Sequence, residues 1–520
     1  MTGRMRGLML DAARLPERPG YYRRFLDFCA QWDVNTVVFR LTDDQGCAMR
    51  FERHPELVTH QHALEKRELA GLVAHAVDLG IEMIPEVESF GHCRYITGAD
   101  RHAGLSDKAE GDTDWREGLI PLHPEVLGLL GDLYEEVAEV FPGRYLHGGC
   151  DEVTWGASRF SAKLLESSTR AQVWAEYLNA LNSRARLLGK EFIVWADMVL
   201  RRDPECLEGL DRGVILHDWI YKEHDPAALR AVASRATEMG FRVIGGPALV
   251  WARWGPRIGR EQLRNVDAFA EAYGEAEDQK VLGLITTNWI PGRFLPGADL
   301  DAQAYAAVAM SEGPAAARAG AFERFTERHF GSGWNETWAD VFHTLYSLAL
   351  PRSSNVAHWM GPFLEVPWHD RGSLADVTGR RPGYLHPYGR LLSQFDELAD
   401  SVKANRRDFE ALRLSAKYLG HLEWRDRAVG VAAEEGPVAL RRAVAEVAAR
   451  DDALLGEVRS AWDLCRPPVS LEPGEGGRPS ADHLLGALAA AAAFSRRFSE
   501  EPGTPGGPAG RGTGEGQASA

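Results

Sequence analysis

RYLHGGCDEV (residues 144–153) combines a short apolar run with two glycines and two adjacent acids, Asp151 and Glu152. Neighbouring carboxylates at the end of a strand repel each other as anions, so one tends to keep its proton near neutral pH while the other stays charged. Such a pair suits acid/base chemistry. The alternative is a helix N-cap followed by a first-turn acid, and the preceding glycines, which permit close backbone approach, weigh against it.

Seven other short apolar runs share the pattern of residues 144–149, and amphipathic helical stretches separate them. This alternation predicts an α/β fold, namely a (β/α)8 TIM barrel. The alternative is an open doubly wound sheet, but no GxGxxG or P-loop motif follows any strand, and a count of eight favours closure. The predicted strands are residues 7–11, 36–41, 82–87, 144–149, 192–196, 214–217, 241–245 and 282–287.

The strand patterns stop near residue 310, and apolar residues then follow helical spacing, as in 391–402 and 454–462. We therefore predict a catalytic barrel over 1–310 and an all-α C-terminal domain over 311–500. Residues 501–520 are rich in Pro and Gly and lack large apolar groups, so we expect a disordered tail.

Composition limits the partners of this chain. Its 520 residues carry a net charge of −16, which argues against a nucleic-acid or anionic-membrane surface. No apolar run is long enough to cross a bilayer, and the N-terminus does not resemble a signal peptide. Six cysteines without CxxC spacing indicate neither a disulfide framework nor a zinc ribbon. These features predict a cytoplasmic protein.

Polar and aromatic residues close the predicted strands, where a barrel of this type carries its chemistry. Acids dominate the first four strand ends and aromatic residues the last four, an arrangement that suits a sugar with polar hydroxyls and apolar C–H faces. Each tryptophan could instead be core packing, and His92 could be a structural histidine. The candidate site residues are Arg14, Asp43, His92, His147, Asp151, Glu152, Trp195, Asp197, Trp219, Tyr221, Trp251, Asn288 and Trp289.

Five segments together resemble the glycoside hydrolase family 20 β-N-acetylhexosaminidases, in family order. They are residues 6–14, 41–45, 84–92, 147–153 and 194–198. The layout is similar to the cytosolic hexosaminidase D type, because no N-terminal α/β domain precedes the barrel and the run Gly149-Cys150-Asp151-Glu152 is shared.

The resemblance implies a retaining exo-hydrolase that removes terminal β-linked GlcNAc or GalNAc. The 2-acetamido group of the substrate sugar would attack the anomeric carbon and form an oxazoline-type intermediate. Asp151 would then orient the acetamido group, and Glu152 would act as acid and base with a raised pKa. Asp43 and His92 would form a relay behind Glu152, and Arg14 would bind sugar hydroxyls.

The resemblance also implies an aromatic pocket made by Trp195, Trp219 and Trp289. Two positions depart from the family pattern. No tyrosine follows the seventh strand near Trp251, so Tyr221 is the candidate for the acetamido contact. The usual Trp-x-Glu becomes Trp289-Ile290-Pro291, which leaves Asn288 as the candidate acceptor for distal hydroxyls.

Two alternative functions remain open from the residues. A metal-dependent barrel hydrolase could use His92, His147, Asp151, Glu152, His217 and Asp218 as ligands. A catalytically silent sugar-binding homologue could keep the pocket without turnover. We expect no metal and no other cofactor, a carbohydrate as substrate, and a helical domain that either packs on the barrel or builds a homodimer.

Overall fold

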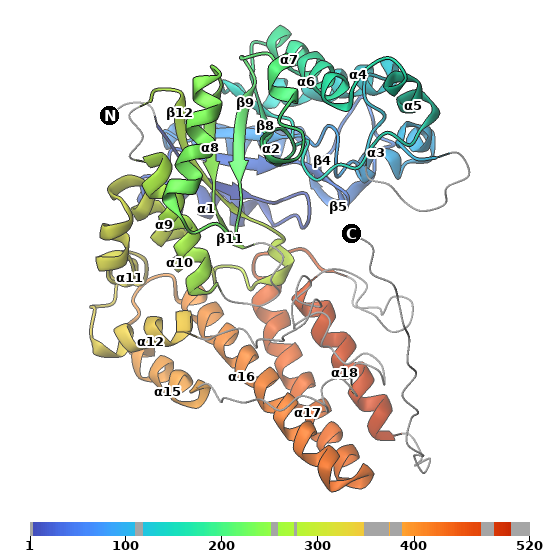
Figure 1. The fold of residues 1–520 in the computed structure, drawn as a ribbon. Coiled ribbons are helices and arrows are strands. Elements are labelled where there is room, and N and C mark those ends of the chain that lie inside the picture. Colours follow the sequence, from blue (N-terminus) through green and yellow to red (C-terminus); the bar gives the residue numbers. More distant parts are fainter. Residues whose placement is uncertain are drawn as a thin grey trace.

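Eight parallel strands form a closed barrel in the computed structural model of the protein (Figure 1). β1 pairs with β2 on one side and with β12 on the other, so the barrel sheet is continuous. This confirms the predicted TIM barrel and excludes the open sheet. The barrel strands are β1 (Met5–Leu10), β2 (Thr36–Arg40), β6 (Glu82–Glu86), β7 (Tyr145–His147), β8 (Glu191–Trp195), β9 (Ile215–Trp219), β10 (Arg242–Gly246) and β12 (Val281–Asn288).

The structure describes residues 4–109, 118–250, 258–274, 278–347, 374, 387–469 and 483–500. Trp251 and the predicted tail over 501–520 lie outside these ranges. Within them, we find no helix with the length and apolar character needed to cross a membrane.

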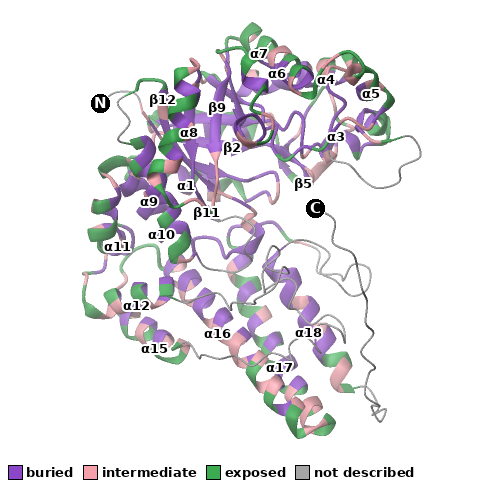
Figure 2. Cartoon of the chain, in the orientation of Figure 1, coloured by how far each residue is buried: buried purple, intermediate pink, exposed green. Residues whose placement is uncertain are grey.

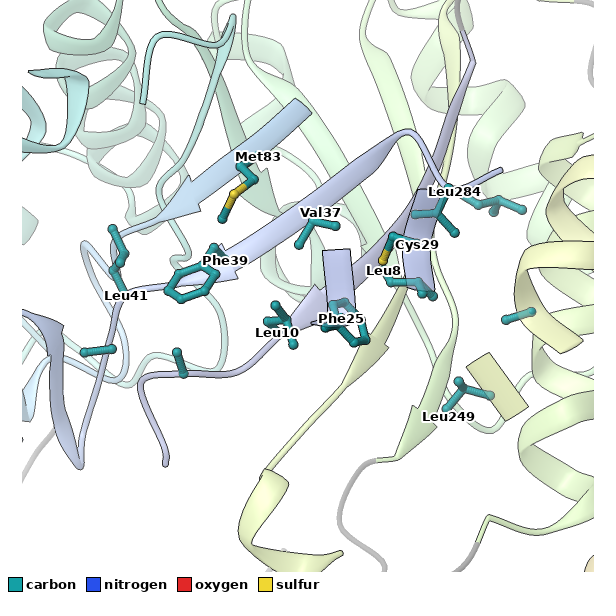
Figure 3. Packing of buried hydrophobic residues seen from close by; sticks show 14 of the residues in the cluster. Leu8, Leu10, Phe25, Cys29, Val37, Phe39, Leu41, Met83, Leu249 and Leu284 are labelled. Atoms are coloured by element: carbon teal, nitrogen blue, oxygen red, sulfur yellow. The ribbon is translucent and has the colours of Figure 1, made fainter. Parts of the chain in front are cut away.

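Strand side chains alternate between the barrel interior and the surrounding helices, because successive residues of a strand point to opposite faces. Leu8 and Leu10 of β1 share an outer cluster with Phe25 and Cys29 of α1 (Pro19–Gln31), as Figure 3 shows. Met9 belongs instead to the interior cluster. That interior cluster consists of Met5, Met9, Val38, Ile84, Tyr145, Ile193, Trp195, Ile215, Ile244, Ile285 and Trp289.

Six of the seven connections between barrel strands contain a long helix, the fifth does not, and a seventh long helix follows β12. Between β8 and β9 the described chain forms only the π-turn η2 (Met198–Arg202) and the short α7 (Cys206–Gly209). Pro204 and Gly213 interrupt this segment and disfavour a longer helix. The long helices are α1, α2 (Lys66–Asp78), α4 (Pro124–Val140), α6 (Arg170–Leu187), α8 (Pro226–Glu238), α9 (Arg260–Gly274) and α10 (Leu300–Glu312).

Short elements after β2, β6 and β7 build the rim on which the acidic residues lie. A separate sheet consists of β3 (Thr42–Asp43), β4 (Gly46–Met49) and β5 (Thr59–Leu64). After β6 the chain forms α3 (Arg94–Thr97) and the 3-10 turn η1 (Asp100–Leu105), and after β7 it forms α5 (Arg159–Leu165). One more short strand, β11 (Ala248–Val250), pairs with β12.

The described chain beyond β12 is helical, as predicted. Three long helices, α16, α17 and α18, extend away from the barrel (Figure 1), and their facing sides are buried (Figure 2). The domain boundary at residue 310 stays a prediction. The helices of this region are α11 (Pro314–Phe330), α12 (Glu336–Ser347), α15 (Tyr388–Leu398), α16 (Arg406–Glu435), α17 (Pro437–Asp463) and α18 (Leu484–Glu500).

Arg466, just after α17, joins the helical region to the catalytic end of the barrel. Its Nε donates to Glu17 Oε1 at 2.9 Å, and its two Nη atoms donate to the carbonyls of Phe294 and Pro291 at 2.6 and 2.7 Å. Its guanidinium also lies over the ring of Trp462. The loops after β1 and β12 are thereby held by one side chain.

Candidate active site

The turn after β7 carries Asp151 and Glu152 in a strained backbone. Gly149, Cys150 and Glu152 all have positive φ, at 64°, 77° and 47°. A Cβ on Gly149 would overlap with the carboxyl group of Glu88, so this position requires glycine. Glu88 Oε2 in turn accepts the Cys150 amide at 3.1 Å and holds the turn in place.

His92 lies against both acids of the pair. Its Nε2 is 3.5 Å from Glu152 Oε2 and 3.9 Å from Asp151 Oδ2. Its Nδ1 is 3.0 Å from Asp44 Oδ2 but 4.0 Å from Asp43 Oδ2. The relay predicted from Asp43 through His92 is thus corrected: Asp44, in the turn after β3, is the direct partner of the imidazole, and Asp43 lies one ångström farther from the same nitrogen and bonds Arg40 instead.

The pKa directions of the pair are the reverse of our expectation. Burial raises the pKa of Asp151. The hydrogen bond with His92 lowers the pKa of Glu152, whose side chain is 57% exposed. Burial alone would lower the pKa of His92, but its contacts with Asp44, Glu152 and Asp151 outweigh burial, so the pKa is raised well above its usual range. In the His92–Glu152 contact, His92 therefore carries the proton and Glu152 is ionised.

Arg40 at the end of β2 is the residue that our sequence reasoning missed. Its side chain is fully buried and donates to Glu86 Oε1 at 3.2 Å and Glu88 Oε1 at 2.5 Å. It also bonds Asp43 and lies 3.7 Å from Asp11. The only sequence signal was a charged residue closing an apolar strand.

Arg14 and Asp43 meet beside this buried cluster. Arg14 Nη2 is 3.2 Å from Asp43 Oδ2, and Arg14 Nη1 is 3.4 Å from Asp11 Oδ2. Burial would raise the pKa of Asp43, but Arg14 and Arg40 outweigh it and lower the pKa far below the usual range. Asp43 is therefore a fixed anion that positions Arg14, whose side chain keeps 14% exposure.

Trp195 and His147 lie inside the barrel, below the acidic rim. Trp195 is 1% exposed, donates its indole N–H to Glu86 at 2.9 Å and stacks on His217 with ring centroids 4.2 Å apart. His147 is fully buried, and its Nε2 lies 3.2 Å from His217 Nδ1. The Trp195 ring lies 5.5 Å from that of Trp289, and the substrate contacts of Trp195 and His147 stay predictions.

Trp289 links the arginines to the aromatic side of the site. Arg14 and Arg40 lie over its ring at 5.1 and 5.0 Å, and its indole N–H donates to Tyr221 Oη at 2.8 Å. Tyr221 stacks on Trp219 at 4.8 Å. Trp219 Nε1 is buried and makes no hydrogen bond within the described residues. These aromatic residues are brought together, as predicted.

Asp197 and Asn288 occupy the edges of the site. Asp197 Oδ2 accepts the Glu152 amide at 3.4 Å, and burial, with Asp151 nearby, raises the pKa of Asp197 to about 7. Asn288 Nδ2 donates to Asp299 Oδ2 at 2.6 Å, so its amide group is oriented by the chain itself.

The ligand set of the metal-hydrolase alternative does not come together. His217 and Asp218 are consecutive in β9 and point to opposite faces. Asp218 contacts Tyr273 and Arg201 outside the barrel, at 2.7 and 2.5 Å. Among the described residues, His92, Asp151 and Glu152 are the only three of that set whose ligand atoms all lie within 4.8 Å of one another, and His147 and His217 form a separate pair.

Three comparisons place the chain among known proteins. Residues 4–252 match the profile "Glycosyl hydrolase family 20, catalytic domain". A beta-hexosaminidase of Akkermansia muciniphila is 28% identical over 166 residues, which cover 28% of this chain and 34% of the relative. Hexosaminidase D of Bos taurus is 28% identical over 207 residues, covering 39% of this chain and 57% of the relative. The chain thus spans about half or less of the length of these relatives.

A solved structure, the chitobiase of Flavobacterium johnsoniae, superposes with a TM-score of 0.50 at 16% identity. The match covers 95% of this chain and 78% of that one, and at this identity it shows the fold alone. The profile match begins in β1 and includes the Asp151-Glu152 turn. The match assigns residues 4–252, just under half of the chain, to the catalytic domain of glycosyl hydrolase family 20.

Proposed function

We propose that the chain is a retaining exo-β-N-acetylhexosaminidase that removes terminal β-linked N-acetylglucosamine or N-acetylgalactosamine. The observation that carries this proposal is the arrangement of Asp151 and Glu152, which have oxygens within 4.8 Å of each other and share His92. Two neighbouring acids on one side of a pocket are not placed to attack a sugar from opposite faces, as two-carboxylate catalysis requires. The nucleophile then comes from the substrate, and a 2-acetamido oxygen supplies it.

In the first step, His92 passes its proton to Glu152, and Glu152 gives a proton to the glycosidic oxygen while the bond from that oxygen to the anomeric carbon breaks. The acetamido oxygen forms a new bond to the same carbon and yields the oxazoline-type intermediate. Asp151 accepts the acetamido N–H and stabilises the positive charge that develops there. Its buried Oδ1 has no hydrogen-bond partner among the described residues, which supports this role.

In the second step, Glu152 takes a proton from water, and the water oxygen attacks the anomeric carbon. The bond from that carbon to the acetamido oxygen breaks, and the sugar leaves with retained configuration. His92 and Asp44 hold Glu152 and exchange charge with it. The strained turn fixes both acids before substrate binds.

The remaining candidates bind the sugar or support the residues that do. Arg14 binds sugar hydroxyls, because Asp43 and Asp11 orient its guanidinium. Trp219 and Tyr221 form the acetamido wall, with the unpartnered Trp219 N–H as a donor. Trp289 and Asn288 line the distal edge. His147, Trp195 and Asp197 support this layer from below.

The test is hydrolysis of the 4-nitrophenyl N-acetyl-β-glucosaminide and N-acetyl-β-galactosaminide. We expect release of nitrophenol, a β-configured product by NMR, and inhibition by thiazoline mimics of the oxazoline. Glu152→Gln should lower kcat/KM by about 10²–10⁴-fold, and less with an activated leaving group than with a natural one. Glu176→Gln on the exposed face of α6 is the matched control and should leave the rate unchanged.

Each negative result points to a specific alternative. A folded protein that releases nitrophenol from neither substrate contradicts the proposal. If it still binds thiazoline, it is the catalytically silent homologue. Loss of activity on chelation with no fall in Tm would instead favour the metal-dependent hydrolase. The ratio of kcat/KM for the two substrates decides the preference for GlcNAc or GalNAc.

We also propose a cytoplasmic location. All six cysteines are free and buried, an arrangement that suits a reducing compartment. Fractionation of the native host tests this assignment. A homodimer through the helical region stays a prediction, to be checked by light scattering of the full chain.

A further inference from the structure

A second cluster of metal-ligating side chains lies outside the acidic turn. His54 and Glu56 come from the segment between β4 and β5, and His102 comes from η1. His102 Nε2 is 2.8 Å and His54 Nδ1 is 3.3 Å from the same oxygen, Glu56 Oε1. We propose that His54, Glu56 and His102 bind a first-row divalent transition-metal ion, with Zn²⁺ as the best chemical match.

The donor set and spacing fit this ion. Ligands about 2.0–2.2 Å from a tetrahedral Zn²⁺ lie roughly 3.3–3.6 Å from one another. The His54–Glu56 distance of 3.3 Å matches this spacing, the His102–Glu56 distance of 2.8 Å is shorter, and the three ligand atoms all lie within 4.8 Å of one another. Two imidazole nitrogens and one carboxylate select zinc over the oxygen-seeking Mg²⁺ and Ca²⁺. The His54 and His102 side chains are 15% and 10% exposed, and that of Glu56 is 24% exposed. The cluster is therefore shielded but reachable from solvent.

Asp132 of α4 supplies the outer contact that metal-binding histidines use. Its Oδ2 lies 3.0 Å from His54 Nε2. A proton on Nε2 makes Nδ1 a bare lone pair that faces Glu56 Oε1. In this tautomer a cation between Nδ1 and Glu56 Oε1, which lie 3.3 Å apart, takes the place of the proton that would otherwise join them. The only competing cation at Glu56 among the described residues is Arg101, 3.8 Å away on a side chain that is 75% exposed.

The site would fasten two segments that carry the proposed relay. The segment of His54 and Glu56 follows β4, the strand that begins just after Asp44, and η1 follows His92 by a short stretch. These segments already share a backbone bond from Val58 N to Tyr95 O at 2.9 Å. The ion is thus a structural staple behind the site. Its binding does not depend on the proposed catalytic function.

The experiment is calorimetric titration of the full chain with ZnCl₂ near neutral pH, together with Co²⁺ absorption spectra and thermal unfolding. We expect one ion per chain, a Co²⁺ spectrum with imidazole ligation, and a higher Tm with Zn²⁺. His54→Ala and His102→Ala should each weaken binding at least about 10-fold, and Asp132→Asn about 10-fold through the loss of the outer contact. His62→Ala, at an exposed position of β5, is the matched control and should bind as the wild type does.

Three results would overturn the proposal. The first is no saturable binding by the wild type, which would make the cluster a protonated imidazole pair on Glu56. The second is unchanged affinity in His102→Ala and His54→Ala. The third is loss of binding in Glu152→Gln, which would assign the ion to the acidic turn. If His102→Ala does not fold, Asp132→Asn decides, because its side chain is 48% exposed and tolerates the change.

Discussion

Arg40 and Arg466 are both buried arginines at the catalytic end of the barrel, yet their surroundings differ. Arg40 lies among four carboxyl groups, from Asp11, Asp43, Glu86 and Glu88. Arg466 meets one carboxyl group and two backbone carbonyls. Around Arg40 acids outnumber cations, whereas around Arg466 donors and acceptors match.

This difference separates a candidate active site, around Arg40, from a structural joint, by which we mean the Arg466 contacts between the helical region and the barrel. Burial raises the pKa of Glu86 to about 7, and that of Glu88 is raised further above its usual range. Bound protons therefore neutralise part of the excess negative charge around Arg40. The charge state of this region changes with pH or with a bound ligand. The Arg466 contacts involve one such group, Glu17, whose pKa burial also raises to about 7, and two backbone carbonyls that do not titrate. The region around Arg40 is suited to chemistry and Arg466 to holding the helical region in place.

The largest effect should come from Arg40→Met. It leaves buried carboxylates without their cation, and we expect a loss of about 3–5 kcal/mol in the free energy of unfolding near neutral pH. The loss should shrink at acid pH, where the carboxyls take up protons. Urea unfolding at about pH 5 and about pH 8 measures this. An equal loss at both pH values would show that Arg40 acts by packing alone.

Arg466→Met should cost less, about 2–3 kcal/mol, because it removes charge-assisted hydrogen bonds whose remaining carboxyl partner can take up a proton. Activity per folded molecule should stay within a few-fold of the wild type. Arg459→Met, on the exposed face of α17, is the control and should change stability by less than about 0.5 kcal/mol. A large loss of kcat without loss of stability would contradict the assignment of Arg466 as a joint.

Glu17 gives the joint a pH dependence. Burial raises its pKa to about 7, so the folded state holds a proton that the unfolded state has lost between about pH 4.5 and about pH 7. Stability should therefore fall as pH rises through that window, by about 1–3 kcal/mol. Glu17→Gln should flatten the fall, as measured by urea unfolding across the window. An unchanged slope would mean that Glu17 is ionised throughout.

His92→Gln should have the smallest effect on stability but a diagnostic one on the pH profile. Removal of the imidazolium raises the pKa of Glu152, because His92 is the first cause of its lowering. The alkaline limb of kcat/KM should move up by about 1 pH unit even as the maximal rate falls. His62→Gln is the control. If the alkaline limb of kcat/KM does not move, ionisation of Glu152 does not determine it.

The sequence predicted the eight strands and the position of the acidic pair, because buried strands leave short apolar runs and the carboxyl ends of barrel strands gather in space. It could not decide between Asp43 and Asp44, since that choice depends on the turn after β3, which brings Asp44 to 3.0 Å from His92 while Arg40 and Arg14 hold Asp43. It also missed Arg40, whose partners come from three other strand ends. The directions of the pKa shifts of Asp151 and Glu152 depend on the burial of each side chain, which the sequence pattern does not predict.

Seven non-glycine residues of the described chain have positive φ, and four of them, His92, Cys150, Glu152 and Ile290, surround the acidic turn. Each such residue costs roughly 1–2 kcal/mol relative to an ordinary backbone conformation. The fold therefore places several of its strained backbone conformations where the chemistry is proposed. Variants selected only for higher thermal stability should therefore carry substitutions that relax this turn, and they should have a lower kcat.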